Sequence, residues 1–260
     1  QKRVGKTSLA LAAAETAVAR TTDSNLETKY ILWGAIASED PRASLRALGE
    51  TIERFILAFI PRSVEFPKAD YTGSLAPLIR IAEIAYQAEK EKKFVITIDE
   101  FDEIHQELYL QGNLADTFFA NIRALSATKN VTINLIGGEN MPFIMERQGQ
   151  KLNKFTRSNL SYFARDTEWE DFKKLIRSPV IDTISWHEDA ISEIFNITNG
   201  NPYFTKILCG TVLRNAVEGR DADVTAREVK DAIGMAVSSL DANSFVHLWQ
   251  DGIFKPAAER

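Results

Sequence analysis

Cysteine and histidine are scarce in this sequence, and their scarcity removes several kinds of functional site. Cys209 is the only cysteine of the 260 residues, so the chain cannot form an internal disulfide. A thiolate metal cluster needs several cysteines and is therefore also disfavoured. The histidines, His105, His187 and His247, lie far apart in the sequence and lack the spacing of metal ligands. The chemistry of the chain has to be carried by other residue types.

An excess of basic charge and long apolar runs are missing as well. Lysine and arginine together number 31 against 36 acidic residues, which gives a net charge of −5. No overall positive field therefore attracts the chain to nucleic acid or to an anionic membrane, although a local basic patch is compatible with this balance. No apolar run approaches the length of a membrane span, and no stretch has the pattern of a secretory leader. We expect a cytoplasmic globular protein without a membrane partner.

A Gly-Lys-Thr-Ser string precedes an alanine-rich stretch near the start of the sequence. It matches the second half of the phosphate-binding pattern G-x-x-x-x-G-K-[ST], whose first glycine would fall one position before Gln1. The buried strand that precedes such a loop would lie further upstream. Gly5 would let the backbone approach a phosphate, and Lys6 would place its charge at the β- and γ-phosphates. Thr7 would ligate Mg²⁺ through its hydroxyl, and Ser8 would reach the α-phosphate.

Such a short string also occurs by accident, as a basic segment before a helix, so it needs support from elsewhere in the chain. Residues Phe94–Ile98 form an apolar, β-branched run that predicts a buried parallel strand. Asp99 and Glu100 follow it at the carboxyl end, where open α/β sheets bind their ligands. Asp99 has the position of the acid that holds the Mg²⁺ shell, and Glu100 that of the acid that polarises the attacking water. The alternative is an acid pair that caps the next helix, which the presence of both motifs disfavours.

Strands alternate with helices in the first part of the sequence, which predicts a parallel sheet with right-handed crossovers. Further strands are expected over Tyr30–Ala37 and Val131–Ile136, and a weaker, short strand over Asn159–Ala164. Apolar stripes predict helices between the strands, one ending near Pro61 and another covering residues 113–127.

The strand over Val131–Ile136 is expected between the acid-bearing strand and the strand before the phosphate loop. It ends on a Gly-Gly-Glu-Asn string, which would then face the γ-phosphate. Asn140 at the end of this string is a candidate sensor of that phosphate. Equally, it is an asparagine that caps the helix containing Pro142. The residues leave both interpretations open.

From Thr167 onward the pattern is all helical and predicts a small bundle with four apolar stripes. The last helix is entered through Thr225 and Glu228, which have the spacing of a capping box. A Gly-Asn-Pro string at residues 200–202 separates two of the helices, since its glycine ends one and its proline suits the first turn of the next. A bundle that closes over nucleotide would give the chain two discrete states.

These strings give the sequence a recognisable family resemblance. It resembles the ATPase core of STAND-type signalling ATPases and their AAA+ relatives, which include NACHT and NB-ARC proteins and the archaeal and origin-recognition initiator ATPases. The resemblance covers residues 1–238 and is carried by the strings GKTS, ITIDEFD, LIGGEN and TNGNPY, which start at Gly5, Ile96, Leu135 and Thr198.

The resemblance implies that the chain binds ATP and Mg²⁺ and hydrolyses ATP. Glu100 and Lys6 would be the catalytic residues, and Thr7 and Asp99 the metal-binding ones. In STAND proteins the proline of a G-x-P motif packs beside the bound nucleotide, and this role passes to Pro202. The guanine-reading pattern N-K-x-D is absent, because the only Asn-Lys pair is followed by Phe-Thr. Adenine is therefore the expected base.

The sequence departs from the family pattern in other places as well. Glu139 lies where a smaller polar residue is more usual. No arginine finger can be assigned, although Arg147, Arg157 and Arg165 are candidates.

We therefore expect an α/β fold, namely a P-loop NTPase parallel sheet followed by a C-terminal helical lid. The expected domains are a nucleotide-binding core over residues 1–165 and a lid over 166–238. Residues 239–260 would be a linker or the start of a winged-helix-like domain.

The expected function is a STAND-type switch that couples ATP hydrolysis to lid closure and homo-oligomerisation, with effector and sensor domains outside these residues. The alternative is an initiator or loader ATPase that acts on DNA through a winged helix, which the acidic charge and the lack of a basic stripe argue against. A third possibility is a module that holds nucleotide without turnover. Glu100 disfavours it, because a scaffold does not need a water-activating acid.

Overall fold

The computed structural model describes residues 4–21, 25–110 and 112–240 of the chain. The described residues fall into two compact units, which are treated separately below. One unit is Lys6–Ser158, and the other holds the described residues of Asn159–Arg260 together with those of Gln1–Gly5. The assignment of residues 1–165 as a nucleotide-binding core and of 166–238 as a lid stays a prediction.

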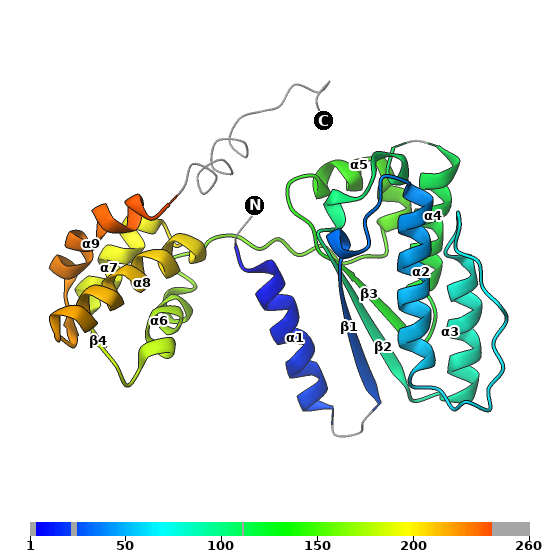
Figure 1. Cartoon of the computed structure of the whole chain (residues 1–260), viewed down its shortest axis with the longest axis horizontal. Coiled ribbons are helices and arrows are strands. Elements are labelled where there is room, and N and C mark those ends of the chain that lie inside the picture. Colours follow the sequence, from blue (N-terminus) through cyan, green and yellow to red (C-terminus); the bar gives the residue numbers. More distant parts are fainter. Residues whose placement is uncertain (1–3, 22–24, 111, 241–260) are drawn as a thin grey trace. The chain divides into compact units, whose positions relative to one another are not determined.

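The first unit is built on three parallel strands in the order β1-β2-β3 (Figure 1). These strands are β1 (Leu26–Leu32), β2 (Lys93–Asp99) and β3 (Val131–Leu135). In the register, Leu32 pairs with Asp99, so β1 and β2 end together at one edge of the sheet. The expected parallel α/β sheet is confirmed. The first strand begins and ends earlier than expected, because the chain turns into a short 3-10 helix, η1 (Trp33–Ala35), once Trp33 is buried.

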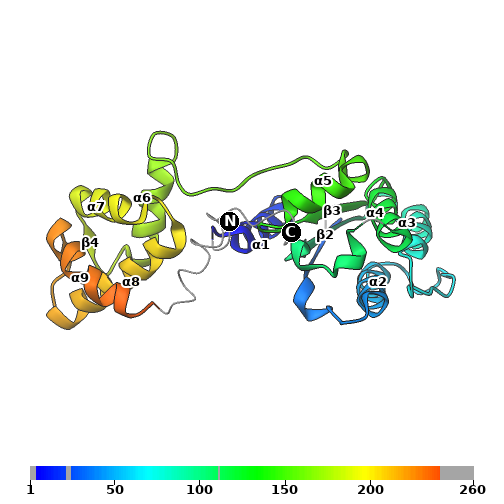
Figure 2. The same cartoon turned by 90° about the horizontal axis from the view of Figure 1, so that it is seen from above.

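Helices α2, α3 and α4 cover one face of this sheet (Figure 2). They are α2 (Pro41–Leu57), α3 (Ala76–Ala88) and α4 (Asn113–Leu125), and α5 (Met141–Leu152) follows β3. Two 3-10 turns, η2 (Phe101–Glu103) and η3 (Gln106–Leu108), lie between β2 and α4. The positions of α2, α3 and α4 agree with the apolar stripes of the sequence, which have the helical period.

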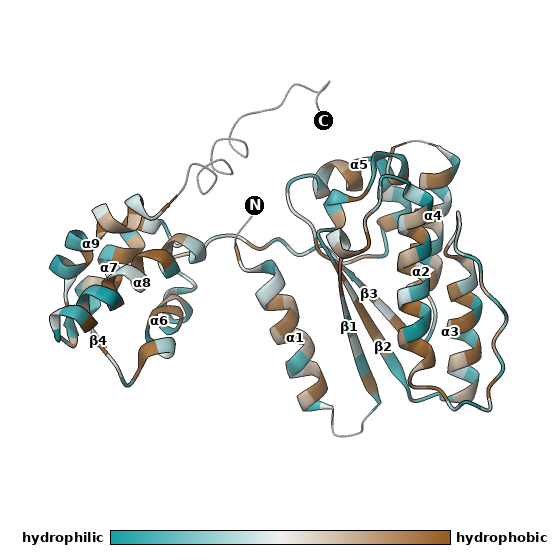
Figure 3. Cartoon of the chain, in the orientation of Figure 1, coloured by the Kyte–Doolittle hydropathy of each residue, from teal (hydrophilic) through white to brown (hydrophobic). Residues whose placement is uncertain are grey.

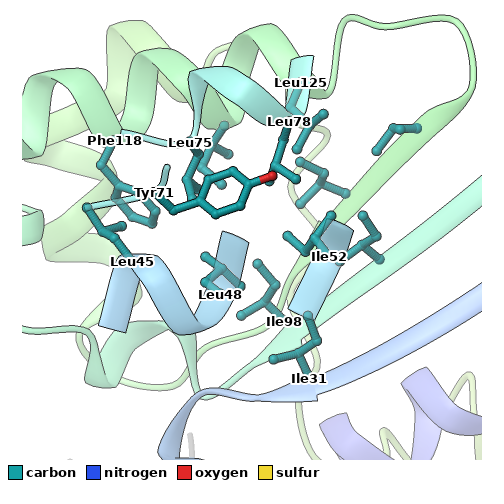
Figure 4. Close-up of a cluster of buried hydrophobic side chains, with 14 of the residues drawn as sticks. Ile31, Leu45, Leu48, Ile52, Tyr71, Leu75, Leu78, Ile98, Phe118 and Leu125 are labelled. Carbon is teal, nitrogen blue, oxygen red and sulfur yellow. The ribbon is translucent and has the colours of Figure 1, made fainter. Parts of the chain in front are cut away.

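The core lies between this sheet face and the three helices (Figure 4). Tyr71, from the segment between α2 and α3, is almost fully buried there. Its ring lies directly against α2 at Gly49, where an added Cβ would stand 2.2 Å from the ring. A glycine at this position is therefore needed to let the aromatic ring enter the core.

Helix α1 (Lys6–Arg20) lies on the opposite face of the sheet and packs mainly on β1 (Figures 1 and 2). None of its residues is fully buried, and Leu9, Leu11 and Val18 are exposed. Hydrophobic stretches along α1 are brown in Figure 3. Because apolar burial of α1 is limited, polar contacts such as those at its first turn contribute to its attachment to the sheet.

The second unit is a helical bundle with its own apolar core. Its helices are α6 (Trp169–Arg177), α7 (Glu188–Thr198), α8 (Pro202–Gly219) and α9 (Ala226–Ser238), with a 3-10 turn η4 (Ser178–Val180) after α6. The predicted capping box is present, since the N–H of Thr225 donates to Glu228 Oε2 at 2.9 Å. The expectation of a purely helical pattern was wrong, because strands β4 (Ser185–Trp186) and β5 (Asp223–Val224) pair in parallel. Strands of two residues leave no periodic signal in a sequence.

The expected strand over Asn159–Ala164 is also wrong, because this segment has no regular structure. Only Phe163 makes a backbone hydrogen bond to a distant partner, donating to the Gly200 carbonyl at 3.0 Å. The prediction for residues 239–260 concerns a segment of which 241–260 lie outside the described residues. Across the part of the chain that the structure describes, no helix combines the length and apolarity that a membrane crossing requires.

Candidate nucleotide site

The residues of the expected phosphate loop lie at the start of α1. Gly5, just before the helix, has a φ of 87°, in the left-handed region that favours glycine. Lys6 and Thr7 begin the helix, and Ser8 is exposed in its first turn. The amide groups of a first helical turn and the positive end of the helix dipole together favour an anion at this place.

Thr7 and Asp99 are 92 residues apart in sequence and are joined by a hydrogen bond. The Thr7 hydroxyl donates to Oδ2 of Asp99, whose side chain is buried at the carboxyl end of β2. Oδ1 of Asp99 accepts the backbone N–H of Glu100 at 2.8 Å. The structure therefore brings the helix motif and the strand motif together at one edge of the sheet.

Tyr30 on β1 completes the surroundings of Asp99, and no motif in the sequence pointed to this residue. Its hydroxyl donates to Asp99 Oδ2 at 2.7 Å. Burial, and then the hydrogen bond to Asp99, raise the pKa of Tyr30 to about 12, so its phenol stays protonated. Only the pairing of the two strands could have identified Tyr30 as a neighbour of Asp99. Tyr30 lies opposite Thr97 and so shares a sheet face with Asp99.

Glu100 follows Asp99 in a left-handed backbone conformation, with φ 56° and ψ 33°. A residue with a side chain adopts this conformation at a cost of about 1–2 kcal/mol, and such residues gather at functional sites. Glu100 makes no side-chain cap bond to η2, although it holds the N-cap position. Its carboxylate lies beside Gly34, where an added Cβ would stand 3.5 Å from Oε2. The geometry gives no support to a capping role for Glu100.

Asp102 links the acid-bearing loop to the loop after β3. Its carboxylate is buried and accepts the backbone N–H of Asn140 at 3.3 Å. It lies so close to the second loop that a Cβ added at Gly137 or Gly138 would stand 3.0 or 3.1 Å from it. A side chain at Gly138 would press on this carboxylate, and one at Gly137 would first meet the Met141 side chain, 2.0 Å from the added Cβ. The Gly-Gly pair was the sequence signal for a close approach of this kind.

Asn140 lies at the N-cap position of α5, but its side chain makes no capping hydrogen bond. The side chain is exposed at the loop that follows β3, next in the sheet to the strand that carries Asp99. The local geometry thus leaves the Asn140 amide available for a ligand, and its role as a γ-phosphate sensor stays a prediction.

The oxygen donors at this edge suit a hard divalent cation. While the Thr7 hydroxyl donates its hydrogen bond to Asp99, its oxygen keeps lone pairs for a metal, and Mg²⁺ prefers oxygen ligands of this type. The described residues contain no group of three or more His, Cys, Asp and Glu side chains able to hold a metal. A nucleotide-bound Mg²⁺ needs only one or two protein ligands, because phosphate and water supply its remaining ligands. Thr7 and Asp99 therefore fit a nucleotide-bound Mg²⁺, which would neutralise phosphate charge.

Pro202 belongs to the other unit, where residues 198–202 form a tight turn between α7 and α8. Gly200 has a φ of 71°, and an added Cβ there would stand 2.3 Å from the Phe163 carbonyl oxygen. The buried Asn201 caps α8 by accepting from the N–H groups of Tyr203 and Phe204 at 2.9 and 3.2 Å. These contacts are sufficient to explain the motif structurally, so a nucleotide contact of Pro202 stays a prediction.

The candidate arginines differ in what surrounds them. The guanidinium of Arg165 lies over the rings of Trp169 and Phe195, at 5.1 and 5.5 Å from their centroids. That of Arg147 lies 5.2 Å from the Phe143 ring. Arg157 is exposed and makes no hydrogen bond, ion pair or ring contact within the described ranges. Arg165 is thus engaged in packing its own unit, whereas Arg157 has its charge available to a partner.

The sequence matches no protein family and no curated protein at a significant level. Solved structures are similar to it in fold. The Aeropyrum pernix ORC2 protein in its ADPNP–ADP complexes has a TM-score of 0.57 at 12% identity over 95% of this chain, and its ADP form 0.56 at 14% over 100%. The Aeropyrum pernix ORC1 protein in complex with DNA has a TM-score of 0.51 at 15% identity over 96%.

The chain spans only 62–68% of the length of these proteins. At such low identity the similarity concerns the fold alone. It agrees with the parallel sheet, the helix that starts at the Gly-Lys-Thr-Ser string and the helical second unit. The chain therefore has the P-loop NTPase fold with a helical C-terminal part.

Proposed function

We propose that this chain binds ATP with Mg²⁺ and hydrolyses it slowly. The observation that carries the proposal is the hydrogen bond from Thr7 to Asp99, which unites two separately recognised motifs. Lys6 would stabilise the terminal phosphates, and Glu100 would polarise the attacking water. The similar ORC2 structures hold ADP or ADPNP, which supports an adenine nucleotide as the ligand.

The proposal is tested by measuring ATP affinity in full-length protein carrying Lys6→Ala. Removing this charge should weaken ATP binding by about tenfold or more, because a charge-assisted hydrogen bond contributes about 1.5–3 kcal/mol. Lys90→Ala, at an exposed position after α3, removes the same charge away from the site and is the control. Calorimetry that finds equal affinities for the parent and the Lys6 variant would refute the proposal.

As the biological role we propose a STAND-type switch, in which ATP binding orders the helical unit and promotes homo-oligomerisation while hydrolysis resets it. The division into a sheet unit and a separately folded helical unit supports this role. Arg157, with its available charge, is the candidate for acting on the nucleotide of a neighbouring subunit.

A second role, as an initiator-type ATPase that acts on DNA, is favoured by the similarity to ORC1 in complex with DNA. Fluorescence anisotropy with duplex DNA at several salt concentrations separates the two roles. Initiator-type binding should weaken steeply with salt, because cation release accompanies phosphate contacts. A signalling switch with net charge −5 should show no such binding at physiological salt.

A further inference from the structure

Tyr30 has no assigned role in the proposed site, yet it contacts the central acid. It lies on β1 opposite Thr97 of β2, and alternation along the strand places Thr97 and Asp99 on the same sheet face. The Tyr30 hydroxyl crosses to β2 on this face and donates to Asp99 Oδ2 at 2.7 Å. It therefore acts on Asp99 from the neighbouring strand.

The Asp99 carboxylate accepts hydrogen bonds from three different elements. Thr7 on α1 and Tyr30 on β1 both donate to Oδ2, and the Glu100 backbone donates to Oδ1. A carboxylate oxygen has two lone pairs, so Oδ2 is fully used and Oδ1 keeps one. The two side-chain donors thus determine which oxygen remains available.

The Tyr30 donor is held firmly enough to impose an orientation. Its strand is paired along its whole length with β2, from Leu26 to Leu32, so the backbone position from which the Tyr30 side chain extends is fixed relative to Asp99. The phenol of a tyrosine carries its proton at neutral pH, so the Tyr30 hydroxyl serves as a donor to Asp99. In contrast, Thr7 is attached to the sheet through a helix without fully buried residues.

We propose that Tyr30 is a positioning residue for the metal, fixing the Asp99 carboxylate in the orientation in which it serves Thr7 and the Mg²⁺ shell. This inference rests on the proposed nucleotide site and extends it to a residue outside its proposed nucleotide and metal ligands. Partners that orient metal-binding groups in this way contribute strongly to metal affinity.

The test is the Mg²⁺ dependence of nucleotide binding in full-length Tyr30→Phe, which keeps the ring and removes only the hydroxyl. A non-hydrolysable ATP analogue is bound at fixed concentration, and Mg²⁺ is titrated. The Mg²⁺ concentration at half-maximal effect should rise by about tenfold. Affinity in the presence of EDTA should stay the same, since Tyr30 acts only through the metal site. Tyr86→Phe, on α3 away from the sheet edge, is the matched control and should match the parent.

A double-variant cycle shows whether Tyr30 acts through Asp99. In an Asp99→Asn background, Tyr30→Phe should have no further effect on Mg²⁺ dependence, because its target is already altered. A full additional loss in this background would overturn the inference, as would an unchanged Mg²⁺ titration of the single variant. Both results leave the proposed function standing if the parent binds nucleotide in a metal-dependent way. A parent that binds no nucleotide overturns the proposed function, and the inference with it.

Discussion

Asp99 and Glu100 are consecutive acids in different surroundings, and they should differ in function. Asp99 is buried and accepts three hydrogen bonds, whereas Glu100 has a left-handed backbone with its carboxylate beside Gly34. Asp99→Asn should weaken Mg²⁺-dependent binding of ATP. Glu100→Gln should preserve binding and reduce turnover by about 10²–10⁴-fold, the usual contribution of general-base assistance.

Paired measurements of nucleotide affinity and single-turnover hydrolysis check both substitutions. A Glu100→Gln protein that hydrolyses ATP at the parent rate would show that another residue positions the water. Glu103→Gln, which changes an exposed acid of the same loop in the same way, controls for the loss of charge.

Cys209 should be an unreactive thiol in the folded protein. It is partly buried against the core of the helical unit, and this burial raises its pKa to about 12. Because the pKa is raised, the thiolate form stays rare until the pH approaches that value, and the thiolate is the reactive species. Labelling with a thiol reagent at pH 8 should therefore be slow in the native protein and fast in urea. Equal rates in both conditions would contradict the packed position.

At the scale of the element, the turn between α7 and α8 offers a test of backbone strain. Gly200→Ala places a Cβ at positive φ and 2.3 Å from the Phe163 carbonyl, so it should destabilise the protein by at least about 1–2 kcal/mol. Gly210→Ala, within α8 and with no atom near its added Cβ, should instead stabilise it by about 0.5–1 kcal/mol. Urea denaturation of the two variants gives both values, and destabilisations of equal size would refute this interpretation.

The sequence predicted elements well where their residues bury a periodic face. The cores of the two units contain the apolar stripes of α2, α3 and α7 and the apolar run of β2. For these elements the predicted buried face is the buried face of the structure. Prediction failed for Asn159–Ala164, which resembles a strand locally but finds no strand partner. It also missed β4 and β5, which depend on a pairing between distant dipeptides.

In the candidate site, too, residues within a local motif could be predicted, whereas residues placed by distant contacts could not. Motif spacing was enough to select Thr7 and Asp99, because their strings have a recognisable chemistry at known positions. Tyr30 and Asp102 were not selected, since their contacts depend on strand register and on the approach of two loops. Such side chains become visible only when the fold places them beside a motif.

At the scale of the whole molecule, the switch proposal requires the helical unit to respond to the nucleotide. A ligand can shift a conformational equilibrium only by contacting the two states differently. We therefore expect hydrogen exchange across residues 198–212, which include Pro202, to slow more with ATP than with ADP. The helix α3, in the other unit, should exchange equally in both states and serves as the internal reference. Identical protection of residues 198–212 in the apo, ADP and ATP states would show that the helical unit does not respond to the nucleotide.

The three hydrogen bonds to Asp99 also affect how mutational surveys of this protein should be interpreted. Asp99 both serves the proposed metal and fastens α1, a helix with no fully buried residue, to the sheet. A lineage that had lost ATP turnover would still be under selection to keep this aspartate for folding. Glu100 occupies a left-handed backbone conformation that a glycine would adopt without strain, so the backbone at this position does not favour a glutamate. The loss of Glu100 would therefore be the earlier sign that a descendant had become a pseudoenzyme.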